Sequence, residues 1–226
     1  MKNFILILFL ATSVFYSCAS NELKNSDNPE IVYNEAVRLL EDESYLEASE
    51  FFAELRRRFP QSRFAVLAEL RSADMDFNQE NYIEAAAGYG VFVDLYPRHK
   101  EAPYALFRKA QSYFKSAPDL VARDQSSAKN AIVAAQAFLS RYPGAEYKKE
   151  VEQILNDSRL KLAQKEAYVA RFYHKREAFE AAIRRWQLLI RDYADIKGSK
   201  EGDSLLKEAT EQISRLQSKI EKGRAS

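Results

Sequence analysis

Four segments of the chain end in nearly the same three residues, and this recurrence constrains the fold more than any other feature. They end in Arg-Phe-Pro, Leu-Tyr-Pro, Arg-Tyr-Pro and Asp-Tyr-Ala. An alanine lies twelve residues before each end, and a second alanine lies further upstream in each segment. The two sets are Ala48, Ala85, Ala131 and Ala182, and Ala36, Ala73, Ala110 and Ala170. Self-similarity at this period predicts stacked pairs of helices, which present extended concave binding surfaces.

The small residues have a physical reason, because two antiparallel helices approach closely only where their side chains are small. The proline that ends three of the segments cannot continue a helix, since it has no N–H group and clashes with the preceding turn. The pattern resembles the tetratricopeptide repeat (TPR), with matches such as Ala48-x3-Phe52 and Ala182-x3-Trp186. It predicts an all-α fold, a TPR α-solenoid of four to five helical-hairpin repeats. Recurrence in a fixed register favours this over an ordinary helical bundle with accidental alanines.

The amino terminus has the proportions of an export signal. Lys2 precedes an almost unbroken apolar run from residue 4 to 14, which is short for a membrane span. Cys18, the only cysteine, follows this run directly. We therefore predict a signal peptide over residues 1–17, a lipidated Cys18 and a flexible tether over residues 18–28. A secretory signal that merely contains a cysteine is the alternative.

The rest of the chain is long enough for one elongated domain, predicted over residues 29–222. The predicted repeats span about 30–62, 65–99, 102–147 and 148–196, followed by a capping helix over 199–222. The third repeat contains nine extra residues, from about Ser116 to Asp124. A long helical spacer, from about Tyr147 to Lys165, precedes the fourth.

Composition argues against several classes of function. After removal of the signal peptide, 33 Lys and Arg balance 33 Asp and Glu, whereas a nucleic-acid-binding domain is usually strongly basic. The two histidines and the one cysteine show no metal-ligand spacing, and no glycine-rich phosphate-binding motif is present. Gly88 and Gly90 lie inside a helical repeat, where they suit close packing. We predict no enzyme, no cofactor, no metal site and no nucleic-acid partner.

The later repeats narrow the resemblance. Val169-Ala-Arg-Phe-Tyr-His-Lys-Arg176 is its most specific stretch. Further matching stretches are Tyr33–Leu40, Phe59-Pro60, Arg123–Gln125, Ala181–Trp186 and Arg191–Tyr193. Together they resemble the BamD family of tetratricopeptide lipoproteins, over most of the mature chain. The resemblance implies a non-enzymatic solenoid held by its lipid at the outer membrane, facing the periplasm.

The same resemblance implies partners. Members of the family bind the barrel-forming BamA-like subunit of the β-barrel assembly machinery, help receive unfolded outer-membrane proteins, and in some cases bind accessory lipoproteins. By the resemblance, Arg185 matches an arginine that contacts an acidic group of the barrel subunit. Arg184 competes for this role, because the helical register could turn either residue outward. Arg171 and Lys175 add positive charge to the same predicted contact.

Offsets within the repeats also predict a client-peptide groove. First-helix residues at fixed offsets from the small position line the concave side of such repeats. This set, the groove set, is largely apolar and aromatic: Tyr33, Val37, Leu40, Leu67, Leu70, Asp74, Phe77, Tyr104 and Phe107. It suits an extended peptide with aromatic side chains, although each aromatic residue could equally belong to the core. The corresponding positions of the fourth repeat are cationic and suit an acidic partner.

Two other functions stay open. A periplasmic TPR lipoprotein that coordinates envelope constriction or cell-wall synthesis would share the repeats but not the stretch around Phe172. A wall hydrolase would need a carboxylate pair or a nucleophile in a closed cleft, and no such pair stands out in the sequence.

Overall fold

The structure is a computed structural model that describes residues 23–225, so the predicted signal peptide and Cys18 lie outside the described residues. The described residues form helices and connecting turns, without strands. They divide into two compact units, unit 1 (residues 23–95) and unit 2 (residues 96–225). None of the helices in these residues combines the length and the apolar character needed to cross a membrane.

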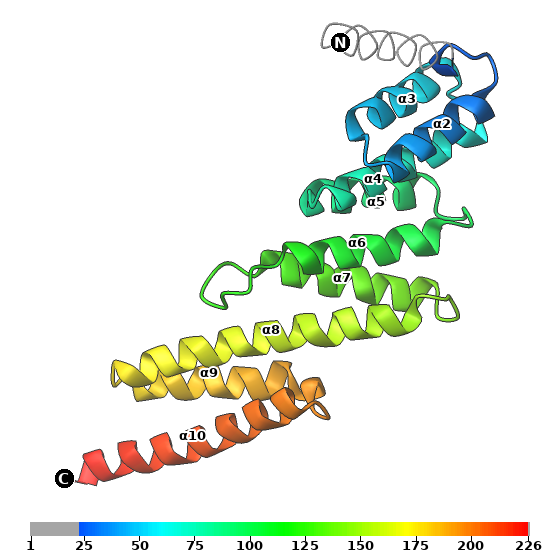
Figure 1. The fold of residues 1–226 in the computed structure, drawn as a ribbon. Coiled ribbons are helices and arrows are strands. Elements are labelled where there is room, and N and C mark those ends of the chain that lie inside the picture. The colour runs from blue at the N-terminus through cyan, green and yellow to red at the C-terminus, as the bar shows by residue number, and fades with distance from the viewer. Residues whose placement is uncertain (1–22, 226) are drawn as a thin grey trace, which may run out of the picture. The chain divides into compact units, whose positions relative to one another are not determined.

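Unit 1 consists of two helical hairpins (Figure 1). They are formed by α2 (Pro29–Glu41) with α3 (Tyr45–Arg58), and α4 (Arg63–Asn78) with α5 (Tyr82–Leu95). Side-chain caps start two of the helices, because Asn28 accepts a hydrogen bond from the N–H of Glu30, and Ser62 accepts one from the N–H of Phe64.

Unit 2 contains two further hairpins and one additional long helix (Figure 1). Its elements are α6 (Ala102–Ser116), α7 (Ser126–Arg141), α8 (Lys148–Lys175), α9 (Phe179–Asp192), the 3-10 turn η1 (Ala194–Ile196) and α10 (Lys200–Ala225). The predicted spacer and the first helix of the fourth repeat are one continuous helix, α8. Consecutive hairpin packing within the units confirms the all-α, TPR-like architecture.

The recurring alanines occupy the contacts between helices. All eight alanines of the two sets are buried. Gly88 shows how close this packing is, because a Cβ atom added there would lie 2.9 Å from the Cβ of Ala73 on the facing helix. A larger residue at either position would therefore push α4 and α5 apart.

The prolines stand where the second helices end. Pro60, Pro97 and Pro143 each lie two residues beyond the last residue of α3, α5 and α7. Ala194 takes the corresponding place after α9, and the chain continues there into η1.

Three of the turns within the helical hairpins have the same backbone conformation. Glu43, Glu80 and Glu177 adopt positive φ angles of 58°, 62° and 59°. In each turn the next N–H bonds back to a carbonyl five residues earlier, for example Ser44 to Leu39 at 2.8 Å, as in a Schellman motif. The α6–α7 connection lacks this turn and contains the nine-residue insertion instead.

The apolar stripe of α10 packs as its spacing predicts. Leu205, Ala209 and Leu216 are buried against a cluster from α8 and α9 that includes Trp186, and the remaining stripe residues, Leu206, Ile213 and Ile220, pack around it. A single helix therefore covers the end of unit 2.

Candidate partner-binding surfaces

The groove set of unit 1 is only partly available at the surface. Tyr33, Val37, Leu67 and Phe77 are half-buried. The Tyr33 ring lies 5.4 Å from the ring of Phe64, and Phe77 packs edge-on against Tyr82 at 5.2 Å. These four residues leave apolar edges that a client peptide could contact.

Three members of the groove set belong to the interior instead. Leu70 is fully buried, and Leu40 and Asp74 are nearly so. The positional offsets placed them on the concave side, but the packing of neighbouring helices covers their side chains. They therefore do not contribute to an exposed groove.

Asp74 is the centre of a buried polar network. It accepts hydrogen bonds from the Tyr89 hydroxyl and from Arg71, both at 2.6 Å. Arg71 also approaches the Tyr33 hydroxyl at 3.4 Å. Burial opposes the positive charge of Arg71, but the hydrogen bonds to Tyr33 and Asp74 outweigh it and raise the pKa of Arg71. The network joins α2, α4 and α5, which fixes the orientation of the Tyr33 ring.

In unit 2 the two predicted groove residues lie under a third aromatic ring. Tyr147 stacks on Phe107 with centroids 4.8 Å apart and rings 3° from parallel, and it meets Tyr104 edge-on at 5.9 Å. Phe107 is buried, whereas Tyr104 stays half-exposed beneath the guanidinium of Arg108. Only Tyr104 can therefore meet a ligand without rearrangement.

The two competing arginines of α9 differ in their surroundings. Arg184 is exposed, and Arg185 is partly exposed and bonds through Nη1 to Glu166 of α8 at 3.1 Å. The remaining nitrogens of Arg185 make no other hydrogen bond that the structure of residues 23–225 shows. A carboxylate from a partner could thus still approach the outer edge of this guanidinium.

Arg171 has a different ion-pair partner from Arg185. Arg171 forms a two-pronged ion pair with Glu208 of α10, at 2.8 and 2.5 Å, and lies over the Trp186 ring. The hydrogen bonds to Glu208 raise the pKa of Arg171, against the opposing effect of burial. Arg171 thus ties α8 to α10, and Lys175 is exposed at the end of α8. Of the four predicted basic residues, Arg171 and Arg185 are therefore paired with carboxylates of this chain.

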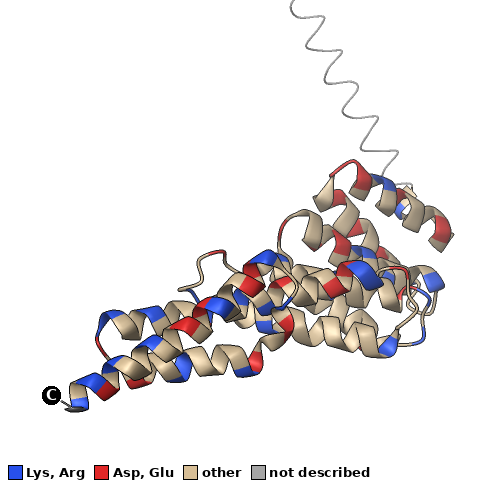
Figure 2. Ribbon diagram, turned by 90° about the horizontal axis from the view of Figure 1, so that it is seen from below, with Lys and Arg blue, Asp and Glu red and all other residues tan. Residues whose placement is uncertain are grey.

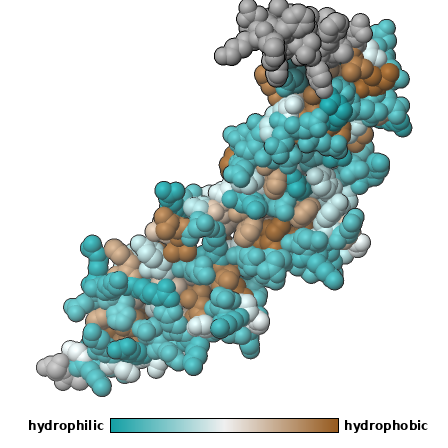
Figure 3. Space-filling view, viewed as in Figure 1, coloured by the Kyte–Doolittle hydropathy of each residue, from teal (hydrophilic) through white to brown (hydrophobic). Residues whose placement is uncertain are grey.

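Two features of unit 2 were not predicted from the sequence. One is an exposed aromatic stripe on α8, formed by Tyr168 and Phe172. Figure 3 shows apolar patches that interrupt the hydrophilic surface of unit 2. The i, i+4 spacing of Tyr168 and Phe172 could have indicated that the two rings share one side of a helix. Whether that side is exposed depends on how far the neighbouring helix α7 extends along α8.

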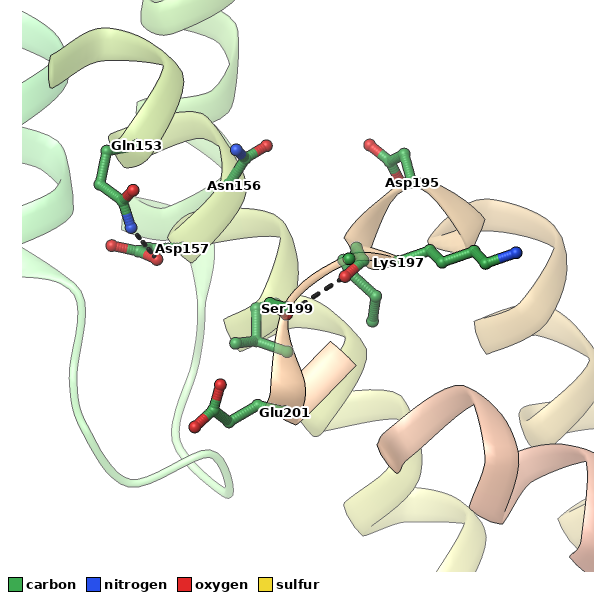
Figure 4. A pocket seen from close by; sticks show the side chains of 10 residues that line it. Gln153, Asn156, Asp157, Asp195, Lys197, Ser199 and Glu201 are labelled. Atoms are coloured by element: carbon green, nitrogen blue, oxygen red, sulfur yellow. Dashed lines mark hydrogen bonds between the residues drawn. The ribbon is translucent and has the colours of Figure 1, made fainter. Parts of the chain in front are cut away.

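The other feature is a polar cavity of about 430 Å³ between α8 and the η1–α10 connection. Figure 4 shows Gln153, Asp157, Asp195, Lys197 and Glu201 around it. Gln153 donates a hydrogen bond to Asp157 at 2.8 Å, so these two lining residues of the cavity already bind each other. Residues 23–225 contain no group of three or more His, Cys, Asp or Glu placed to hold a metal ion.

Comparison with known proteins shows the family. Residues 25–224 match the YfiO family, described as outer membrane lipoprotein. Among similar proteins is one from Caulobacter vibrioides named outer membrane protein assembly factor BamD, 30% identical over 161 residues, which are 71% of this chain and 52% of that protein. Proteins of the same name from Rickettsia prowazekii and Neisseria meningitidis serogroup A are 30% and 27% identical, over 72% and 96% of this chain.

The extent of the matches differs among these relatives. The chain spans about half the length of the Caulobacter protein and 64% of the Rickettsia protein, but 87% of the Neisseria protein. The family match covers nearly all described residues of both units. The chain therefore belongs to the YfiO family of outer membrane lipoproteins.

Proposed function

We propose that this protein is a scaffold subunit of the machinery that assembles β-barrel proteins into the outer membrane. The observation that carries the proposal is the similarity, over most of the chain, to proteins named outer membrane protein assembly factors. A stack of helical hairpins without a metal-binding cluster in its described part suits a binding role.

The proposed scaffold is anchored through Cys18 and faces the periplasm. A diacylglyceryl thioether and an amide-linked acyl chain together provide two membrane signals, where a single chain gives only marginal binding. The Cys18→Ala variant should lose labelled fatty acid and leave the outer-membrane fraction. Retention of that variant in the membrane would argue against lipid anchoring.

Unit 1 is the proposed site for unfolded clients. Tyr33, Val37, Leu67 and Phe77 supply half-buried apolar side chains, and the Asp74 network holds Tyr33 in place. A photo-crosslinking amino acid at position 37 or 77 should capture a terminal β-strand peptide of an outer-membrane protein. Leu46, which is exposed on α3, provides the matched control. Equal capture at position 46 would indicate nonspecific adhesion.

Unit 2 is the proposed site for the barrel-forming subunit. A guanidinium can hold a carboxylate through two parallel hydrogen bonds, which lysine cannot copy. Arg185 is the preferred residue because Glu166 holds one end of its guanidinium in place. Arg184 is more exposed but makes no ion pair in the described structure.

The whole proposal is tested by purifying the tagged mature protein from solubilised membranes. A barrel-forming outer-membrane protein with periplasmic domains should copurify in stoichiometric amount, and depletion of the chain should reduce folded outer-membrane proteins. Copurification with cell-wall synthesis or constriction proteins, without a barrel-forming protein, would assign the chain to another periplasmic scaffold.

A further inference from the structure

Helix α8 runs past the ends of α6 and α7, two of the helices that pack beside it. It contains 28 residues, whereas α6 and α7 contain 15 and 16. Figure 1 shows the C-terminal part of α8 extending beyond α6 and α7, on the side of their connecting loop. We name five residues there the overhang surface: the exposed Leu120, Tyr168, Phe172 and Arg176, and the half-buried Lys165.

One face of α8 changes from buried to exposed along its length. Ile154 and Phe172 are 18 residues apart, which is about five full turns, so they point in the same direction. Ile154, in the N-terminal half of α8, is 7% exposed, whereas Phe172, near its C-terminal end, is 45% exposed. Tyr168, one turn before Phe172, is 43% exposed. Among residues 23–225, the overhang surface therefore continues this face of α8 into a part that stays exposed.

Positive charges line this aromatic face. Arg176 lies 5.0 Å above the Phe172 ring, and Lys165 lies 5.9 Å from the Tyr168 ring. The Lys165 ammonium bonds to the carbonyls of Ala122 and Arg123, which are neutral acceptors and leave its charge uncompensated.

The insertion loop completes the surface in a fixed position. Lys161 bonds to the carbonyls of Ala117 and Pro118 and to the Asp119 carboxylate, at 3.2 to 3.3 Å. With Lys165 it ties the loop to α8 at both ends. Leu120, at the middle of the loop, remains 65% exposed. The nine inserted residues thus add an exposed apolar side chain on a loop that is bonded to α8.

We infer that the overhang surface binds an amphipathic helix of a partner protein, with an apolar stripe flanked by Asp and Glu. A helix fits because α8 already packs against the helices α6 and α7, and the same face of α8 is buried at Ile154, about five turns earlier. Acidic flanks fit because unit 2 has a net charge of +9 and cations border both rings. This site does not use Arg185, so it adds a second partner contact to the proposed function.

The test uses a stapled 15-residue helix with leucines on one face and glutamates beside them. A second probe replaces each glutamate with lysine, and a third consists of vesicles of phosphatidylethanolamine and phosphatidylglycerol. Binding to the mature protein is measured by fluorescence anisotropy and vesicle sedimentation. We expect the acidic helix to bind at least tenfold more tightly than the basic helix. Tyr168→Ser and Phe172→Ser should each raise its Kd about tenfold.

Val133→Ser is the control, because Val133 is an exposed apolar residue of α7, 65% exposed, outside the overhang surface. It should leave the Kd unchanged, and circular dichroism should show all variants folded. Equal binding of the acidic and basic helices, or an equal effect of Val133→Ser, would overturn the proposal. Vesicle binding that depends on Phe172, without helix binding, would overturn it in favour of a membrane contact.

Discussion

The two units are built from the same hairpin but carry opposite charges. Unit 1 contains 15 Asp and Glu against 7 Lys and Arg, a net charge of −8, whereas unit 2 contains 17 against 26, a net charge of +9. Figure 2 shows Lys and Arg on turns near the C-terminus and along other helices, with Asp and Glu between them. A formal net charge of +1 for the whole chain conceals this difference. The chemistry of partners must therefore be assessed for each unit separately.

The hairpin turns show the same difference at the level of single residues. In unit 1 the turns expose Asp42, Glu43 and Glu80, and the first turn of α5 exposes Glu84. The α8–α9 turn of unit 2 has the same left-handed backbone at Glu177 but is preceded by Lys175 and Arg176. The fold tolerates either charge at these solvated positions, so the charges are available for binding.

The largest predicted effect tests whether the two units are also separate in stability. Trp186→Ala removes a large buried side chain from the core of unit 2, and Phe52→Ala does so in unit 1. Each substitution should lower the free energy of unfolding of its own unit by about 3–5 kcal/mol. Hydrogen exchange should accelerate throughout the unit that carries the substitution. Equal acceleration in both units would show that they unfold as one.

A somewhat smaller effect is expected for partner binding to unit 2. Arg185→Ala should weaken binding of the barrel subunit's periplasmic domains by about 2–5 kcal/mol, mainly through faster dissociation. Arg184→Ala should cost less than about 1 kcal/mol, as is typical of an exposed ion pair. Surface plasmon resonance at two salt concentrations measures both. If neither variant differs from wild type, the contact is not made through α9.

The third prediction concerns the stability that the buried Asp74 network gives to the interior of unit 1. Tyr89→Phe removes the hydroxyl that donates to the buried Asp74 carboxylate, and should cost about 1.5–3 kcal/mol. Urea unfolding measures the loss. Tyr113→Phe, at a half-buried tyrosine of unit 2, is a control for removing a hydroxyl outside the network. Similar costs at both positions would show that the network adds no particular stability.

The smallest predicted effect on stability concerns two neighbouring carboxylates of unit 1, Asp76 and Glu84. Burial, with Glu84 nearby, raises the pKa of Asp76 above its ordinary value of 3.8. The folded state therefore holds this proton more tightly than the unfolded state, and the charged carboxylate destabilises unit 1 once the pH exceeds the raised pKa. Asp76→Asn should stabilise unit 1 at pH 7 by less than about 1 kcal/mol.

The pH dependence supplies the check. Thermal melting should show the advantage of Asp76→Asn at pH 7 and its disappearance below pH 3.8, where aspartate is protonated in both states. Glu84→Gln should reproduce part of the effect. An advantage that persists at low pH would have to come from packing instead of charge.

Much of the fold followed from recurrence along the chain. The eight buried alanines, the helix ends before Pro60, Pro97 and Pro143, and the apolar stripe of α10 all lie where spacing indicated. Each depends on local geometry that repeats with the helical period. The binding residues were harder to predict, because Leu67 and Leu70 have the same chemistry but only Leu70 is fully buried.

The sequence by itself determined the helical hairpins, their small contact residues and the family, because these depend on periodic patterns within single segments. Only the tertiary structure decided which apolar and charged residues reach the surface. Arg185 turns toward Glu166, Arg171 is occupied by Glu208, and Phe172 is exposed while Ile154 is buried. The physical reason is that exposure depends on where neighbouring helices begin and end, and residues far apart in the sequence set those limits.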